Sequence, residues 1–181
     1  MKRQTLFVGV LILGLTLISV PSPRVVDAAR SADFDGDWYA DLAVGVRYEG
    51  IGSASLAGAV NVLYGQSGIG LDDPDNQFWY QDGNGLVDTA EAQEAFGSAL
   101  AVGDFDGDGY TDLAIGVPLE SVGSVVNAGA VHILYGAAPG LAASRNQLLS
   151  QDSPGILDDA ETDDYLGWVM TVGDFNADGF D

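Results

Sequence analysis

Residues 104–112 read DFDGDGYTD, an acidic loop that runs directly into the apolar stretch LAIGV of residues 113–117. The loop places aspartates at positions 1, 3, 5 and 9 and glycines at positions 4 and 6. Alternate carboxylates at this spacing meet at one centre, and hard oxygen ligands of this kind favour a hard cation. Glycine lets the backbone turn tightly around such an ion. The loop therefore predicts a calcium site between two strands.

The loop recurs along the chain. Residues 33–41 read DFDGDWYAD and residues 174–181 read DFNADGFD, so the three copies begin 71 and 70 residues apart. Flanking segments recur in the same register, since GAVNVLYG at residues 58–65 matches GAVHILYG at residues 129–136. Self-similarity at a fixed period indicates tandem structural units that pack against one another.

Each unit predicts short strands separated by turns. In the second unit the expected strands are residues 97–103, 112–117, 129–135 and 146–150. Four strands per repeat is typical of a propeller blade, so the predicted fold is an all-β propeller of four-stranded blades, with about two blades in this chain. The small residues near Gly97 suit an innermost strand, although packing against a bulky neighbour would select them equally well.

The predicted calcium ligands are the side chains at positions 1, 3, 5 and 9 of each loop and the backbone carbonyl at position 7. In chain order they are Asp33, Asp35, Asp37, Tyr39, Asp41, Asp104, Asp106, Asp108, Tyr110, Asp112, Asp174, Asn176, Asp178 and Phe180. An EF-hand is excluded because position 12 is Ile115 and because strands, not helices, flank the loop.

The three loops are not equivalent. Trp38 stands at position 6 of the first copy, where the second has Gly109, and a bulky residue is costly in a left-handed conformation. The third copy has Asn176 for one aspartate and Ala177 for the first glycine, so we expect weaker binding there. Asp and Gly also form plain polar turns. A turn does not need four acids that repel one another without a cation, so a structural calcium is the preferred interpretation.

Composition excludes several function classes. The chain carries 27 acidic and 6 basic residues and a formal net charge of −21, which excludes nucleic acid as a partner. It has no cysteine, which excludes disulfides, thiolate metal sites and cysteine catalysis. The single histidine, His132, lies in a predicted strand and is interpreted as a strand-face residue, not a catalytic base.

Paired carboxylates offer one enzymatic alternative. Asp88 with Glu91, and Asp158 with Glu161, have residue types that act on glycosidic bonds. Because the pairs recur in both copies, loop structure explains them better. We therefore predict that the chain is not an enzyme in its own right.

The N-terminus predicts export. A basic start at Lys2 and Arg3 precedes the 15-residue apolar run of residues 6–20, which is too short to span a bilayer comfortably. Residues 1–28 are therefore predicted to be a signal peptide cleaved before Ala29, with an uncleaved anchor as the alternative. Residues 29–181 form the repeat region, which contains no later segment able to cross a membrane, and the expected location is secreted or cell-surface.

The chain is expected to be the N-terminal fragment of a longer protein. Asp181 is the eighth position of a loop whose ninth position is Asp41 or Asp112 in the earlier copies. A propeller needs roughly four to eight blades. We expect the missing blades of the same propeller, and any fused catalytic domain, to follow, and the fragment alone to expose blade faces and associate.

The chain resembles the FG-GAP repeats of the integrin α-subunit propeller and of their bacterial relatives. Residues 96–97 (FG) and 129–131 (GAV) stand at the positions that give the repeat its name, and the resemblance covers residues 31–181. Leu166 replaces the motif phenylalanine in the third copy, and Val131 stands where the name has proline. The resemblance implies a seven-bladed propeller with calcium in hairpin loops on one face and, in integrins, ligand recognition and cell adhesion on the other.

Two functions are compatible with this sequence. The first is a calcium-binding adhesion or recognition scaffold for an unidentified protein or glycan at the cell surface. The alternative is a targeting or carbohydrate-binding propeller module of an extracellular hydrolase. The aromatic residues 78–80 (FWY) allow carbohydrate stacking, but residues 148–150 of the next copy read LLS, so packing is the preferred role of the aromatic group.

Overall fold

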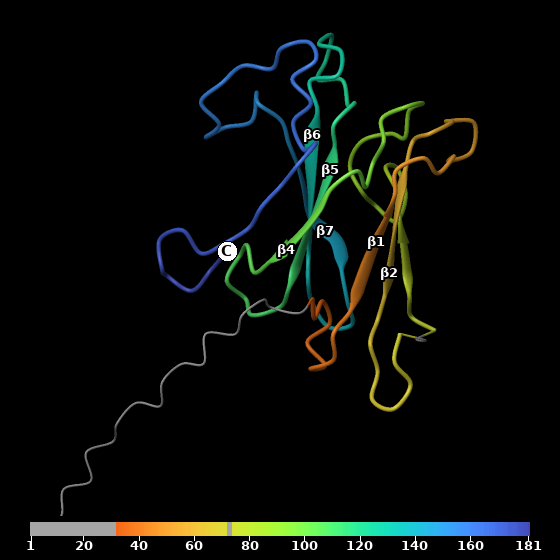
Figure 1. The fold of residues 1–181 in the computed structure, drawn as a ribbon, viewed down its shortest axis with the longest axis vertical. Helices are drawn as coiled ribbons and strands as arrows, with labels where there is room; N and C mark the ends of the chain where they lie inside the picture. The colour runs from red at the N-terminus through yellow and green to blue at the C-terminus, as the bar shows by residue number, and fades with distance from the viewer. Residues whose placement is uncertain (1–31, 72–73) are drawn as a thin grey trace, which may run out of the picture.

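The computed structural model describes residues 32–71 and 74–181 (Figure 1). Within these ranges the chain forms two antiparallel sheets and no helix, which confirms the predicted all-β propeller fold. The predicted signal peptide, residues 1–28, lies outside the described residues. A search of the described part for a helix long and apolar enough to span a membrane found none.

The first sheet, here the first blade, contains β1 (Leu42–Val46), β2 (Ala59–Leu63) and β3 (Gln77–Trp79) in that order. By analogy with the second blade, a fourth strand would precede the loop at residues 33–41. Residues 29–31, which come before that loop, lie outside the described ranges. Trp79 is buried at 3% exposure, whereas Phe78 is 39% exposed and lies 5.6 Å from the Tyr80 ring. The aromatic group thus divides between core and surface.

The second sheet, the second blade, is a four-stranded meander of β4 (Leu100–Gly103), β5 (Asp112–Val117), β6 (Ala130–Tyr135) and β7 (Ala142–Leu149). The predicted bounds of β5 are confirmed, but β4 begins later and β7 earlier than predicted. Gly97 has a left-handed φ of 83° and contacts the other blade, so it precedes the strand. The start of β7, residues 142–145, reads AASR, without apolar alternation, and Ala142 pairs with Tyr135 only through a register shift in β6.

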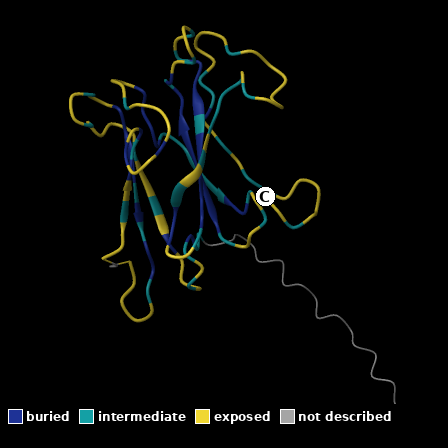
Figure 2. Cartoon of the chain, turned by 180° about the vertical axis from the view of Figure 1, so that it is seen from behind, coloured by how far each residue is buried: buried dark blue, intermediate teal, exposed yellow. Residues whose placement is uncertain are grey.

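The core lies between the two blades (Figure 2). Leu113 and Ile115 of β5 are fully buried because the first blade covers them. The equivalent residues of β1, Leu42 and Val44, are 43% and 40% exposed. The same sequence is therefore buried or exposed according to whether a preceding blade packs on it, as expected of a repeat architecture.

The FG and GAV segments meet at the junction between blades. The Phe96 N–H donates to the Ala57 carbonyl at 2.8 Å, and Phe96 pairs with Gly58 in a parallel bridge. A Cβ at Gly45 would overlap the carbonyl oxygen of Gly97, so only glycine permits this approach. Leu166 repeats the contact by bridging to Gly129. Small residues therefore serve close contact with the backbone of the neighbouring blade.

Candidate metal-binding loops

The first loop (residues 33–41) and the second loop (residues 104–112) each lead into an equivalent strand, β1 and β5, so both lie at the same edge of the blades (Figure 1). Neighbouring loops are joined by backbone hydrogen bonds. The Thr111 N–H donates to the Asp33 carbonyl at 3.1 Å, and the Asp181 N–H donates to the Asp104 carbonyl at 3.1 Å. The third loop (residues 174–181) therefore continues the same row.

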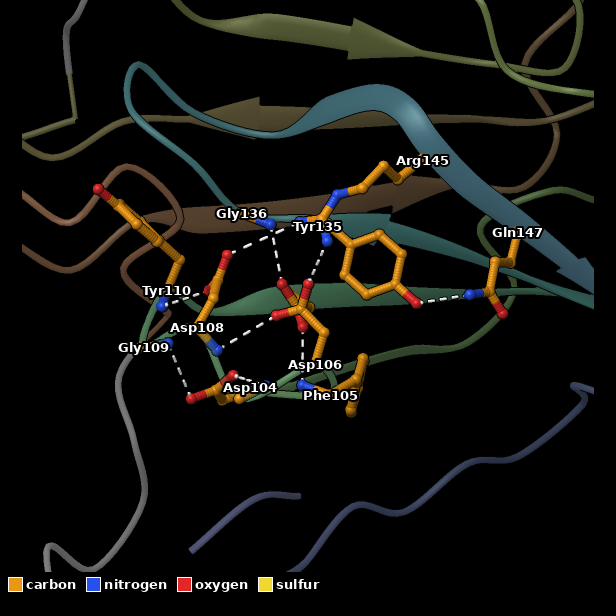
Figure 3. Close-up of polar contacts among 12 residues, drawn as sticks. Asp104, Phe105, Asp106, Asp108, Gly109, Tyr110, Tyr135, Gly136, Arg145 and Gln147 are labelled. Atoms are coloured by element: carbon orange, nitrogen blue, oxygen red, sulfur yellow. Dashed lines mark hydrogen bonds and ion pairs between the residues drawn. The ribbon is translucent and has the colours of Figure 1, made fainter.

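The aspartate at position 1 organises the turn in each loop. In the second loop Asp104 accepts a hydrogen bond from Gly107 N–H at 2.8 Å and another from Gly109 N–H at 3.1 Å, one on each carboxylate oxygen (Figure 3). Both glycines have left-handed φ values, 76° and 94°. The first loop makes the same two bonds from Gly36 and Trp38 to Asp33. Trp38 thus adopts the left-handed conformation expected at position 6, with φ 74°.

Three carboxylates converge in each of the first two loops. One oxygen from each of Asp104, Asp106 and Asp108 lies within 4.8 Å of the others, and positions 1, 3 and 5 of the first loop form the same group. In the third loop Asn176 Nδ2 donates to Asp178 Oδ2 at 2.8 Å, so an amide takes the place of one acid. The predicted ligands at positions 1, 3 and 5 are therefore brought together in the first two loops, and the side chains at positions 3 and 5 also meet in the third.

Position 9 has a different role in the hydrogen-bond pattern. Asp112 is buried, and its two oxygens accept from Phe105 N–H at 2.7 Å and Gly136 N–H at 2.8 Å. Asp41 is bonded equivalently in the first loop. Burial raises the pKa of both Asp41 and Asp112 to about 6. The two hydrogen bonds lower the pKa, and the charges of the neighbouring aspartates raise it further. Both carboxylates connect the loop to the segment that follows the neighbouring strand, Gly136 after β6 or Gly65 after β2. Neither belongs to the groups of three converging carboxylates at positions 1, 3 and 5.

Position 7 makes a contact that the sequence did not reveal. The N–H of Tyr110 donates to Asp108 Oδ1 at 3.0 Å, and Tyr39 and Phe180 are held in the same way in their own loops. The Tyr110 ring packs where a Cβ of Gly36 would stand, 2.6 Å from that position. Phe180 covers Gly107 equivalently. The rings of Tyr110 and Phe180 therefore each cover the position 4 glycine of the preceding loop.

Arg145 of β7 is a second feature that sequence reasoning missed. Its Nη1 lies 2.7 Å from Asp106 Oδ2 and its Nη2 lies 3.7 Å from Asp108 Oδ2 (Figure 3). The guanidinium also lies 4.9 Å from the centre of the Tyr135 ring. The two aspartates lie 37 and 39 residues before Arg145 in the sequence. Only the strand pairing brings them together, so no local pattern could have shown the contact.

The donor set fits calcium. Every candidate ligand is a hard oxygen, and a carboxylate triplet with further carbonyl and water ligands suits the irregular shell of six to eight oxygens that calcium takes. Burial and then the repulsion of Asp37 and Asp33 raise the pKa of Asp35, which shows that the acids are crowded. A divalent cation relieves this crowding, whereas a plain turn leaves it uncompensated.

His132 has no access to these loops. It is fully buried in β6 and its ring lies 5.4 Å from that of Phe96 in an edge-on arrangement. Burial lowers its pKa to about 4, and neither ring nitrogen has a hydrogen-bond partner among the described residues. The histidine is therefore a packed strand residue, as predicted.

Comparisons with known proteins agree with this architecture. Residues 96–134 match the FG-GAP repeat. The chain is 32% identical over 163 residues to phosphatidylinositol-glycan-specific phospholipase D of Rattus norvegicus, which covers 90% of the chain and 18% of that protein. It is 35% identical over 164 residues to the Homo sapiens protein of the same name, with 89% and 18% coverage. Identity to integrin alpha-7 of Mus musculus is 31% over 125 residues, or 68% of the chain and 9% of that integrin. The chain thus spans less than a fifth of these relatives.

Proposed function

Because this chain is an FG-GAP repeat protein with integrin-like propeller blades, we propose that it is a secreted or cell-surface recognition module whose acidic loops bind structural calcium. The main support for this proposal is the convergence of Asp104, Asp106 and Asp108, which the same three positions of the first loop repeat. Calcium at these positions pins the hairpin between the two strands that each loop joins. We expect an affinity on the order of 0.1 to 1 mM, as in other extracellular modules.

The location follows from the predicted signal peptide at residues 1–28. An apolar run behind Lys2 and Arg3 is a typical export signal, and a calcium site of millimolar affinity is filled outside cells, where calcium is plentiful. Fusion of residues 1–31 to a reporter tests the assignment. Export with cleavage before Ala29 supports it, and retention of the reporter in the cytoplasm contradicts it.

The recognition surface is proposed for the end of the blades opposite the calcium loops. In this arrangement calcium stiffens one edge, and the connecting loops at the other end contact a protein or glycan ligand. The integrin alpha-7 and FG-GAP matches support adhesion or recognition as the role. Binding of the calcium-loaded protein to a glycan array, compared with binding to extracellular matrix proteins, separates the two ligand classes.

A second candidate is a propeller module that serves an extracellular hydrolase. The matches to phosphatidylinositol-glycan-specific phospholipase D favour it, because they cover 90% of the chain for the rat protein. In this reading the chain carries no catalysis itself and positions a separate catalytic domain at its substrate. Hydrolysis of a glycosylphosphatidylinositol substrate by the natural full-length protein favours this candidate, and adhesion without hydrolysis favours the first.

Calcium binding itself is tested by titration calorimetry on the wild type and on Asp106→Asn/Asp108→Asn. We expect the variant to bind one ion fewer, because two of three converging carboxylates become neutral. Asp158→Asn/Asp159→Asn is the matched control, since it removes the same charge from exposed residues outside the loops. Equal loss of binding in the control variant would show a nonspecific effect of net charge and contradict the assignment.

A further inference from the structure

A third group of carboxylates lies at the other end of the second blade. The second loop precedes β5, whereas Glu120 follows it, so the two are separated by the length of the strand. One oxygen from each of Glu91, Glu94 and Glu120 lies within 4.8 Å of the others. Glu94 and Glu120 are 3% and 5% exposed, in contrast to the mostly accessible acids of the loops.

The group joins three segments of the chain. Glu91 and Glu94 belong to the connection between blades, and the Glu91 N–H donates to Glu94 Oε2 at 2.7 Å. Glu120 lies three residues after the end of β5 and accepts from Ser121 N–H at 3.0 Å. Gln81, just beyond β3 of the first blade, donates from Nε2 to Glu120 Oε2 at 2.6 Å. The four side chains therefore meet where the first blade, the connection and the second blade come together.

Two buried oxygens in this group have no donor. Neither Glu94 Oε1 nor Gln81 Oε1 has a hydrogen-bond partner among the described residues. Gln81 is 1% exposed, and because its Nε2 contacts Glu120, its Oε1 lies beside the carboxylates. A buried acceptor without a partner costs about 1 to 3 kcal/mol. Both are hard oxygens, and a cation bound beside the carboxylates would supply the positive partner that each lacks.

No positive side chain of the described residues balances the three acids. Arg145 pairs with the second loop, and Arg47 lies over the Tyr48 ring. Burial, followed by the charges of neighbouring acids, raises the pKa of Glu94 to about 8 and that of Glu120 to about 7. An open hollow of about 360 Å³, lined in part by Glu91, Glu94 and Ser121, gives solvent access to the group.

The arrangement recurs one repeat later. Gln151, Glu161 and Asp164 occupy the places of Gln81, Glu91 and Glu94. The Glu161 N–H donates to Asp164 Oδ2 at 2.7 Å, and Gln151 Oε1 is again a buried oxygen without a partner. Three of the four donors therefore recur at the same spacing, which indicates that they belong to the repeating unit.

We propose that Glu91, Glu94 and Glu120, with the amide oxygen of Gln81, form a second site for calcium, which fastens the blade junction at the end opposite the acidic loops. The donors are all oxygens, and the mixture of carboxylates and an amide carbonyl suits calcium. An ion here satisfies the two orphaned oxygens and links three segments that a hairpin calcium does not reach. The site uses no residue of the acidic loops, so the two calcium assignments can be tested separately.

Selective labelling distinguishes the two kinds of site. The only glutamates of the chain are Glu49, Glu91, Glu94, Glu120 and Glu161, and none lies in an acidic loop. In protein labelled with ¹³C at glutamate carboxyls, CaCl₂ is expected to shift the Glu91, Glu94 and Glu120 resonances at pH 7 while Glu49 stays unchanged. The shifts are expected to persist in Asp106→Asn/Asp108→Asn. Absence of any calcium-dependent shift in the wild type overturns the proposal and leaves a proton shared between buried acids.

A substitution supplies the second measurement. Glu120→Gln keeps the size of the side chain and removes one ligand charge, so we expect about a tenfold or greater loss of calcium affinity at this site alone. Glu49→Gln is the matched control, because Glu49 occupies the same repeat position in the first blade but is exposed. Equal calcium stoichiometry and affinity in the two variants, each checked for folding by circular dichroism, overturns the proposal.

Discussion

At the scale of single residues, each loop depends on one carboxylate and on two left-handed positions. Asp104 binds the backbone N–H groups of positions 4 and 6 with its two oxygens, which closes the turn. This leaves the carboxylates of positions 3 and 5 to face the same centre. The backbone N–H groups and the single positive charge of Arg145 do not neutralise three acids, and this is the physical reason to place a cation there.

The first loop carries a removable strain at position 6. Trp38 has φ 74° and is 92% exposed, so its side chain gains little packing in return for a left-handed backbone. Trp38→Gly is expected to raise the free energy of unfolding by about 1 kcal/mol, since part of the relieved strain is offset by glycine's freedom in the unfolded chain. Urea denaturation in chelator measures this.

Gly109→Ala is the reciprocal control. Gly109 has φ 94°, and a Cβ there would meet no atom within 4 Å, so the substitution tests conformation without a clash. It is expected to destabilise the protein by about 1 kcal/mol. If Trp38→Gly left stability unchanged or lowered it, the assignment of strain to position 6 would be wrong.

His132 gives a prediction about pH. Its folded pKa of about 4 lies below the unfolded value of about 6.5, so the unfolded chain binds the proton first. The contribution of the neutral ring is complete above pH 6.5 and is lost as the pH falls toward 4, by up to about 3 kcal/mol. His132→Phe should remove this loss. The test is the difference in unfolding free energy between wild type and variant, measured at pH 7 and at pH 4.5. The raised pKa values of Glu94 and Glu120 stabilise the fold as the pH falls, opposite to His132. Their effect is the same in both proteins and cancels in the difference. A difference independent of pH would contradict the prediction.

At the scale of elements, the blade junction depends on backbone contact between neighbouring sheets. A Cβ at Gly45 would overlap the Gly97 carbonyl, so Gly45→Ala is expected to destabilise the protein by about 1 to 3 kcal/mol. Gly50→Ala is the control, because its Cβ would approach only the Ala54 carbonyl, at an ordinary 3.8 Å. Equal thermal stability of the two variants would refute the junction as described.

Arg145 is expected to weaken calcium binding in the second loop. Its guanidinium contacts Asp106 and Asp108, so in the absence of calcium it relieves the repulsion between the two carboxylates. The same positive charge repels a calcium ion that binds to them. Arg145→Gln should lower the calcium-free stability by about 0.5 kcal/mol and raise calcium affinity roughly threefold. Melting curves with chelator and with calcium measure both effects. Arg47→Gln, which changes a cation outside the loops, is the control, and a matching response there would contradict the prediction.

The repeat made the strands and loops predictable, because the loop residues occur three times, and the strand residues that follow them twice, at the same spacing. The start of β7 was not predictable, since its AASR sequence lacks the alternation of a strand and its pairing depends on a bulge in β6. Arg145 and the Glu120 group were missed because their partners come from other segments of the chain. Glu91 was interpreted as loop structure alone, and its buried neighbours became visible only once the blades were packed.

At the scale of the whole molecule, the acidic charge is organised into sites. The net charge of −21 would oppose a compact fold if it were spread evenly. The structure instead concentrates acids in a row of loops at one edge and in a buried group at the opposite end of the second blade. Divalent ions at both ends would hold the blades together where burial of apolar side chains between the sheets does not reach.

Thermal unfolding of the chain with calcium and with EGTA tests the central claim most directly. Calcium at about 100 times its dissociation constant is expected to raise the melting temperature by roughly 5 to 10 °C, since each filled site adds about 2.7 kcal/mol. Asp104→Asn/Asp106→Asn/Asp108→Asn should show a clearly smaller rise. About 10 mM calcium is well above the dissociation constant expected of such loops. If the wild-type melting temperature were the same in EGTA and at that calcium concentration, the result would contradict the account.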